Sequence, residues 1–145
     1  MASAGAVPTH IGRYEVIREL ASGGMAELFL ARFVGPGGFE KRCAIKRVRP
    51  QLARDETFGR MLLDEAKIAA RFEHPNLVQI YELGEDDQAQ LFVAMELVNG
   101  LDLRQLAARV AEHDARVPLE LVTWIMAQVL EGLAYAHTFT SPEGE

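Results

Sequence analysis

One carboxylate interrupts the apolar face of a predicted helix, and it follows a strand that carries a lysine in its middle. Within residues 57–72 apolar side chains recur at spacings of three and four, which predicts a helix with this inner face: Phe58, Met61, Leu62, Ile68, Ala69 and Phe72. Glu65 falls on that face, whereas Asp64 falls on the outer one. Lys46 lies within the strand-like run 43–48. Because buried charges need opposite partners, we expect Lys46 and Glu65 to pair.

A second placement of Glu65 stays open. Acidic residues are rarely fully buried unless they are paired, so Glu65 could lie at the edge of the apolar face with its carboxylate in water. The helical pattern by itself favours neither placement.

A turn of small residues precedes the lysine strand. Residues 20–28 read Leu-Ala-Ser-Gly-Gly-Met-Ala-Glu-Leu and separate two strand-like stretches. Small residues let a backbone approach a phosphate group closely and direct its N–H groups at the oxygens. The alternative is a Gly-Gly hairpin that binds nothing.

The order of these features resembles the small lobe of eukaryotic-type protein kinases. The glycine-rich loop of that family matches Ala21, Gly23, Ala26 and Leu28, and its V-A-I-K lysine matches Lys46. Three further matches follow in order: Glu65 to the family's helix glutamate, His74-Pro75-Asn76 to its H-P-N turn, and residues 95–103 to the segment that joins the two lobes. The sequences of residues 23–26 and 35–41 are similar to those of bacterial serine/threonine kinases, particularly those of myxobacteria.

The resemblance implies an ATP site and a protein substrate. Lys46 would hold the α- and β-phosphates and Glu65 would position it, which makes these two the expected catalytic residues. The residues expected to contact the nucleotide are Leu20, Ala21, Ser22, Gly23, Gly24, Met25, Ala26, Leu28, Ala44, Lys46, Met95, Glu96, Val98 and Asp102. Leu20 and Leu28 would cover the adenine, and Met95 would control access to the rear of the pocket. Asp102 either meets the ribose or caps a helix.

Two departures from the family pattern limit the expected activity. Ala21 and Ala26 replace two of the three loop glycines, and we expect weaker phosphate contact as a result. The catalytic loop and the D-F-G motif, which carries metal ligands for Mg²⁺, do not occur within these 145 residues. We therefore expect no metal site in this chain and no phosphotransfer by the chain alone. The alternatives are a nucleotide-binding pseudokinase that regulates a partner, and a structural domain in which Lys46 and Glu65 only form an ion pair.

Composition supports one soluble, cytoplasmic domain. The chain is 49% apolar and 25% charged, and its net charge of −6 argues against a nucleic-acid partner. We interpret the basic run Lys41, Arg42, Lys46, Arg47 and Arg49 as a mostly solvated strand face, with Lys46 the exception. The single Cys43 cannot form an internal disulfide. No signal peptide is visible, and we expect no stretch that approaches a membrane span.

The expected fold is α+β, with a kinase-like small lobe followed by the first two helices of a large lobe. We assign residues 1–10 to a flexible N-terminus, 11–98 to the small lobe with its ATP site, and 99–145 to the exit from the hinge and the start of an incomplete large lobe. Five antiparallel strands are predicted near residues 14–20, 27–32, 42–48, 77–83 and 90–97. Because other large-lobe helices would cover the apolar face of residues 118–137, we expect the isolated chain to self-associate through this face or to be marginally stable.

Overall fold

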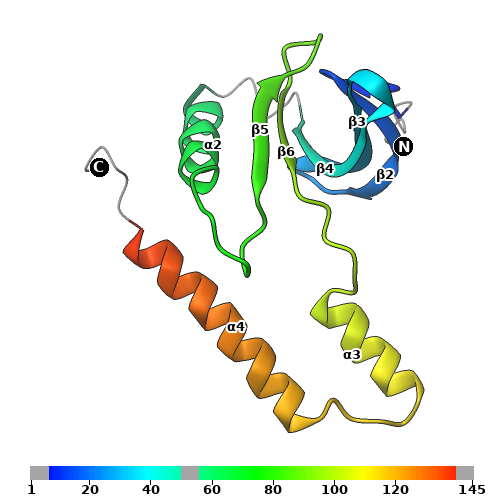
Figure 1. Ribbon diagram of the computed structural model, residues 1–145, viewed down its shortest axis with the longest axis vertical. Coiled ribbons are helices and arrows are strands. Elements are labelled where there is room, and N and C mark those ends of the chain that lie inside the picture. The colour runs from blue at the N-terminus through cyan, green and yellow to red at the C-terminus, as the bar shows by residue number, and fades with distance from the viewer. Residues whose placement is uncertain (1–6, 50–55, 140–145) are drawn as a thin grey trace. The chain divides into compact units, whose positions relative to one another are not determined.

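The chain forms a curled antiparallel sheet with one packed helix, and two further helices follow (Figure 1). A computed structural model describes residues 7–49 and 56–139. The predicted α+β class is confirmed. The chain divides into a sheet unit, Met1–Arg71 with Gln79–Leu97, and a helical unit, Phe72–Val78 with Val98–Glu145. Residues 72–78, which are predicted to belong to the small lobe, are part of the helical unit.

The described part of the chain contains a sheet of six strands, one more than predicted. In chain order they are β1 (His10–Ile11), β2 (Tyr14–Ser22), β3 (Ala26–Val34), β4 (Glu40–Val48), β5 (Ile80–Glu85) and β6 (Leu91–Met95). Their spatial order is β1-β2-β3-β4-β6-β5, and every neighbouring pair is antiparallel. The additional strand pairs His10 with Glu15. Ordered pairing therefore begins at His10, inside the segment that the sequence analysis had assigned to a flexible terminus.

The two faces of the sheet carry different side chains, because successive residues of a strand point to opposite faces. The face that we call the core face holds the buried cluster Ile11, Tyr14, Phe29, Ala31, Cys43, Ile45, Phe92 and Ala94. The opposite face, which we call the helix face, carries Leu28, Lys46 and Val93 in one cross-strand row and Ala44 with Met95 in the next. This register confirms that Ala44 and Lys46 share a face.

Helix α2 (Glu56–Ala69) packs along β5 (Figure 1), but not through all of the predicted residues. Ala66 is buried, whereas Met61 and Ile68 are more than half exposed. The side chains of Phe58 and Leu62 lie outside the described residues. Since Ala66 and Ala69 are small, the helix can approach the sheet closely on the side that they occupy, and the predicted apolar face is rotated partly into solvent.

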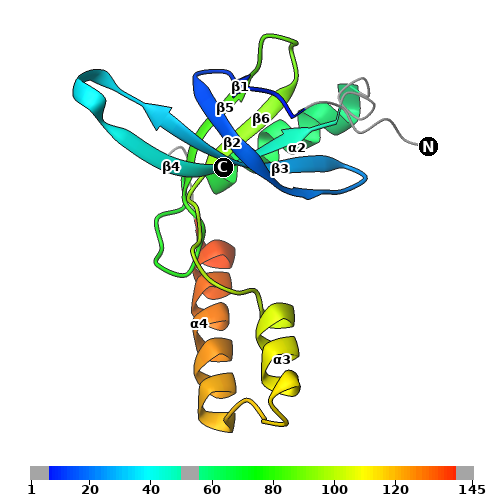
Figure 2. The same ribbon diagram turned by 90° about the vertical axis from the view of Figure 1, so that its right-hand side faces the viewer.

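In the helical unit, α3 (Leu103–Glu112) and α4 (Leu119–Thr138) run in opposite directions (Figure 2). The segment 72–78 packs on α4. The Phe72 ring lies edge-on to Tyr135 at a centroid distance of 5.9 Å, and the Asn76 side-chain amide donates to Gln128 Oε1 at 3.2 Å. Gly132 is buried where the helix meets Asn76, and a Cβ there would lie 3.4 Å from the Asn76 carbonyl oxygen.

Much of α4 is apolar and exposed. The exposed apolar side chains on this helix are Leu119, Leu121, Val122, Trp124, Met126, Val129, Leu130 and Leu133. By length and composition, α4 is the one helix in residues 7–49 and 56–139 that could cross a membrane, which the sequence analysis did not expect of any stretch. A core helix of a soluble protein meets the same two criteria, so this finding is weak support for a membrane span.

Self-association through α4 stays a prediction, and we expect the sedimentation coefficient of the 145-residue chain to rise with protein concentration. The physical reason is the exposed apolar area, since association removes it from water. Analytical ultracentrifugation across a concentration series is the measurement. A single monomer boundary at all concentrations, together with a melting temperature that does not change with concentration, would contradict the prediction.

Candidate functional site

The small-residue turn connects β2 to β3, as predicted. Gly23 N–H donates to the Ala26 carbonyl at 3.0 Å and closes the turn, and the Met25 side chain at its tip is exposed. Leu20, Ala21 and Ser22 form the end of β2, where Ala21 pairs with Leu28 across the hairpin. The only positive φ angles at described non-glycine positions occur at Ala89 and Asp114, so the loop alanines replace glycine without backbone strain.

Arg49 holds this loop, a role that the sequence pattern does not predict. Its Nε donates to the Gly23 carbonyl at 2.8 Å and its Nη2 donates to Ser22 Oγ at 2.6 Å. The Arg49 backbone N–H also donates to the Met25 carbonyl at 3.1 Å. The rigid fork of a guanidinium suits two acceptors on one turn. Pairing of β3 with β4 brings Arg49 to the loop, and no local pattern in the sequence signals that contact.

Replacing Arg49 with alanine is expected to loosen the loop. Loss of the two side-chain hydrogen bonds should accelerate amide exchange at Gly23 by about 5- to 30-fold, because a typical hydrogen bond contributes about 1 kcal/mol and two bonds are lost. Hydrogen exchange measured by NMR tests this. Arg42→Ala removes an exposed arginine from β4, the strand that ends immediately before Arg49, and should leave the Gly23 rate unchanged. Equal exchange in both variants would contradict the role assigned to Arg49.

Lys46 and Glu65 line one small pocket but do not form an ion pair. A cavity of about 140 Å³ lies between the helix face of the sheet and α2, and its walls are Lys46, Val48, Glu65, Ala66, Ala69, Ile80, Val93 and Met95. Both charged side chains are exposed, and no ion pair between them is present in the described part of the chain. The expected buried pair is therefore wrong for this conformation, and Glu65 takes the alternative placement, at the edge of the apolar face of α2 with its carboxylate exposed. Water solvates each charge, so neither requires the other.

Met95 and Glu96 occupy the end of β6 and the residue after it. Met95 is half buried and pairs with Ala44 and Ile80 in the sheet. The Glu96 N–H donates to the Gln79 carbonyl at 2.8 Å, and the Glu96 carboxylate accepts from Gln79 N–H at 3.3 Å. This N–H is thus already engaged, which leaves the Glu96 carbonyl as the group that could meet an adenine edge.

Val98 and Asp102 belong to the helical unit, and their surroundings are described within that unit. Val98 is exposed. Asp102 is the N-cap of α3: its Oδ1 accepts from Gln105 N–H at 2.7 Å, and Gln105 Oε1 accepts from Asp102 N–H at 3.1 Å. This reciprocal capping box confirms the helix-cap alternative for Asp102.

Arg47 is held in an ion-pair network and is not a solvated residue. Its Nη2 lies 2.8 Å from Glu27 Oε2 and its Nη1 lies 3.6 Å from Asp86 Oδ2. The guanidinium also lies over the Phe29 ring, 5.3 Å from the centroid. The interpretation of the basic run as a mostly solvated face was wrong at this position, because Arg47 projects from the core face and only Lys46 of this pair projects from the helix face.

Comparisons with known proteins agree with this geometry. Residues 14–140 match the family described as the protein kinase domain. The chain is 40% identical over 134 residues to the tyrosine-protein kinase MasK of Myxococcus xanthus, and 35% identical over 126 residues to the serine/threonine-protein kinase PrkC of Bacillus subtilis. These alignments cover 92% and 87% of this chain. The crystal structure of the Mycobacterium tuberculosis PknI kinase domain superposes with a TM-score of 0.73 at 33% identity.

The chain therefore belongs to the protein kinase family. It spans about a fifth of the length of the curated relatives, 21% of MasK and 18% of PrkC, and 52% of the PknI kinase-domain chain. The match to PknI covers 91% of this chain, so nearly all of its residues correspond to part of a kinase domain.

Proposed function

We propose that this chain is the ATP-binding portion of a protein kinase that transfers the γ-phosphate of ATP to serine or threonine residues of proteins. One observation carries the proposal. Lys46 is exposed and has no ion-pair partner among the residues that the structure describes. It stands on the helix face of the sheet, next in register to Leu28 of the small-residue hairpin and in one pocket with Glu65. An unpaired ammonium beside a backbone turn of small residues is suited to phosphate oxygens.

The neighbouring residues suit the remainder of a nucleotide. Ala44 lies two residues before Lys46 on the same face, and its small side chain leaves room for a flat base. Leu20 and Leu28 are half buried and supply apolar cover from β2 and β3. The Glu96 carbonyl is the hydrogen-bond acceptor at the end of β6.

The proposal assigns Glu65 a positioning role that requires a rearrangement. Phosphoryl transfer in kinases depends on an ion pair between the strand lysine and the helix glutamate. Glu65 already lines the Lys46 pocket. A shift of α2, or a change in the two side-chain conformations, would bring the charges together without any change in the strand register.

Mg²⁺ would accompany the nucleotide, and it supplies neutralisation of the phosphate charge. Residues 7–49 and 56–139 contain no group of three His, Cys, Asp or Glu side chains that could hold a metal ion. The proposal therefore takes the protein ligands of Mg²⁺ to be outside these residues. The named relatives include both serine/threonine and tyrosine kinases, so the acceptor hydroxyl is part of what must be tested.

The test is calorimetric titration of the purified chain with MgATP, followed by incubation with γ-labelled ATP and a protein acceptor. We expect saturable binding without transfer of label by the chain alone, because the catalytic motifs do not occur in its sequence. Absence of binding at millimolar MgATP would contradict the proposal. If a longer polypeptide that contains this chain transfers label, phosphoamino-acid analysis identifies the acceptor, and binding without transfer there would favour the pseudokinase alternative.

A further inference from the structure

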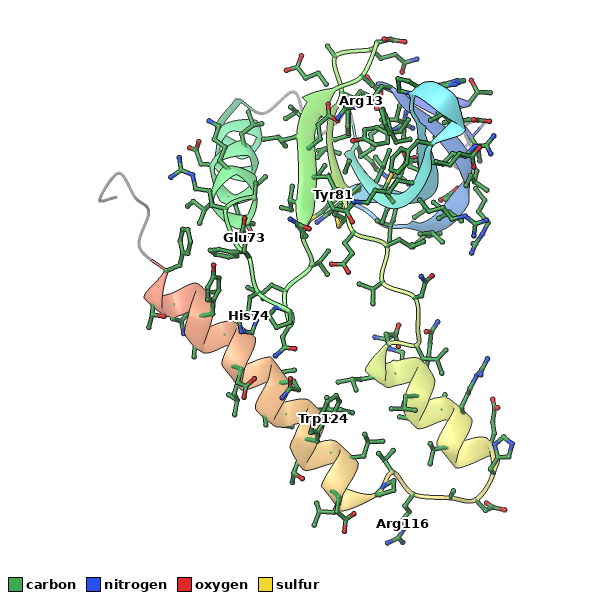
Figure 3. All side chains as sticks on the ribbon, viewed as in Figure 1. Arg13, Glu73, His74, Tyr81, Arg116 and Trp124 are labelled. Atoms are coloured by element: carbon green, nitrogen blue, oxygen red, sulfur yellow. The ribbon has the colours of Figure 1, made fainter. Side chains whose placement is uncertain are left out.

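The core face of the curled sheet is open at one end. A cavity of about 310 Å³ lies there, and its principal walls are Arg13, Tyr14, Phe33, Lys41, Cys43 and Tyr81. Arg13 and Tyr81 are labelled in Figure 3, where Arg13 lies beside β5, the strand that carries Tyr81. Lys41 and Cys43 project from β4 on the face opposite to Ala44 and Lys46, so this cavity is separated from the Lys46 pocket by the sheet itself.

A β-bulge builds one wall of the cavity. The register of β5 against β6 shifts between Ile80 and Glu82, so Ile80 opposes Met95 while Glu82 opposes Ala94. The extra residue places two successive side chains, Tyr81 and Glu82, toward the core face. Without the bulge, strict alternation would direct only one of them to this face.

The interior of the cavity is aromatic and apolar. The Tyr14 and Phe33 rings meet edge-to-face at a centroid distance of 6.2 Å. Cys43 is 1% exposed, and burial raises the pKa of its thiol, which therefore stays neutral. These aromatic and apolar groups suit the flat apolar ring of a ligand.

The entrance of the cavity carries positive charge that the described residues do not fully neutralise. Glu82 is shared by two groups, since Arg13 Nη2 lies 2.7 Å from Glu82 Oε2 and the Tyr14 hydroxyl donates to the same oxygen at 2.7 Å. The Lys41 ammonium lies 3.9 Å from the Tyr81 ring centroid, and no carboxylate pairs with it within the described ranges. A cation–π contact satisfies this ammonium only in part, because it leaves the charge itself without a counterion.

We propose that this cavity is a binding site for a small aromatic carboxylate. The carboxylate would pair with Lys41 beside Arg13, and the ring would enter between Tyr81 and Phe33. A volume near 310 Å³ lies at the lower end of the range for small-molecule sites, and such sites occur at the mouths of curled sheets and barrels. The simpler interpretation is that Lys41 only covers the Tyr81 ring.

The experiment is an NMR titration of the ¹⁵N-labelled 145-residue chain with 2-naphthoate, and with 2-naphthamide as an uncharged probe of the same shape. We expect saturable amide shifts centred on Phe33, Cys43 and Tyr81, with weaker binding of the amide. Lys41→Met keeps the length of the side chain and removes its charge, and it should weaken naphthoate binding by about threefold or more. Arg42→Met removes a charge from the opposite face and should leave the affinity unchanged.

Three results would each overturn this proposal. They are shifts confined to the exposed residues of α4, equal affinity for the two probes, and unchanged affinity in Lys41→Met. Melting curves of both variants test whether they are folded. Lys41 is exposed and contacts the Tyr81 ring, and methionine can keep an apolar contact with that ring. Lys46→Met should not alter naphthoate binding. The proposed carboxylate site and the proposed nucleotide site can therefore be tested independently of each other.

Discussion

Lys46→Met is expected to weaken binding of MgATP by about 10- to 100-fold, because a hydrogen bond to a charged group contributes about 1.5–3 kcal/mol. The melting temperature should change little. Lys46 is exposed and forms no ion pair in the part of the chain that the structure describes, so the substitution breaks no contact that holds the fold. The methionine side chain remains compatible with its cross-strand neighbours Leu28 and Val93. Calorimetric titration, paired with thermal melting, measures both quantities.

Lys67→Met is the matched control for this experiment. Lys67 is an exposed lysine on α2 whose ammonium lies 3.4 Å from Asp64 Oδ1 on the surface. Its loss removes the same charge from the chain and should leave the MgATP affinity within about twofold. If Lys46→Met bound MgATP as tightly as the unmodified chain does, the assignment of Lys46 to the phosphates would be wrong.

Phe92→Ala is expected to lower the free energy of unfolding by about 3–5 kcal/mol, the usual cost of removing a buried phenyl ring. Phe92 is 2% exposed and lies edge-to-face with Tyr14 at a centroid distance of 6.1 Å. The opposite residue, Gly84, leaves space for the ring, since a Cβ there would lie 2.8 Å from Phe92 Cζ. Because domains of this kind are stable by only about 5–15 kcal/mol, the variant should be close to unfolding.

Urea denaturation measures the free energy of unfolding of Phe92→Ala. Gly84→Ala and Phe39→Ala are the comparison variants. Gly84→Ala should cost about 1–3 kcal/mol, because the added methyl group overpacks the same ring. Phe39→Ala removes the same side chain from a position that is 58% exposed, and we expect a loss below about 1 kcal/mol. Equal losses for Phe39→Ala and Phe92→Ala would contradict the placement of the core.

The order of elements and the loop could be predicted from the sequence because both depend on local patterns. Strand alternation correctly placed Ala44 and Lys46 on one face, and small residues correctly indicated the hairpin turn at residues 22–26. The placement of Glu65 could not be predicted. Periodicity defines which residues share a helical face, but how far that face turns toward the sheet depends on packing, and the small residue Ala66 occupies the closest position.

The sequence by itself determined the family and the two periodicities, since these depend on residue type and spacing. Tertiary structure alone decided three features. Arg49 reaches the loop only because β4 pairs with β3, and Arg47 meets Asp86 only because β4 pairs with β6. The bulge at Tyr81 depends on the register between β5 and β6. Each feature joins residues that are distant in the chain. Such contacts depend on how the strands of the whole sheet pair and pack, and local sequence patterns do not determine that pairing.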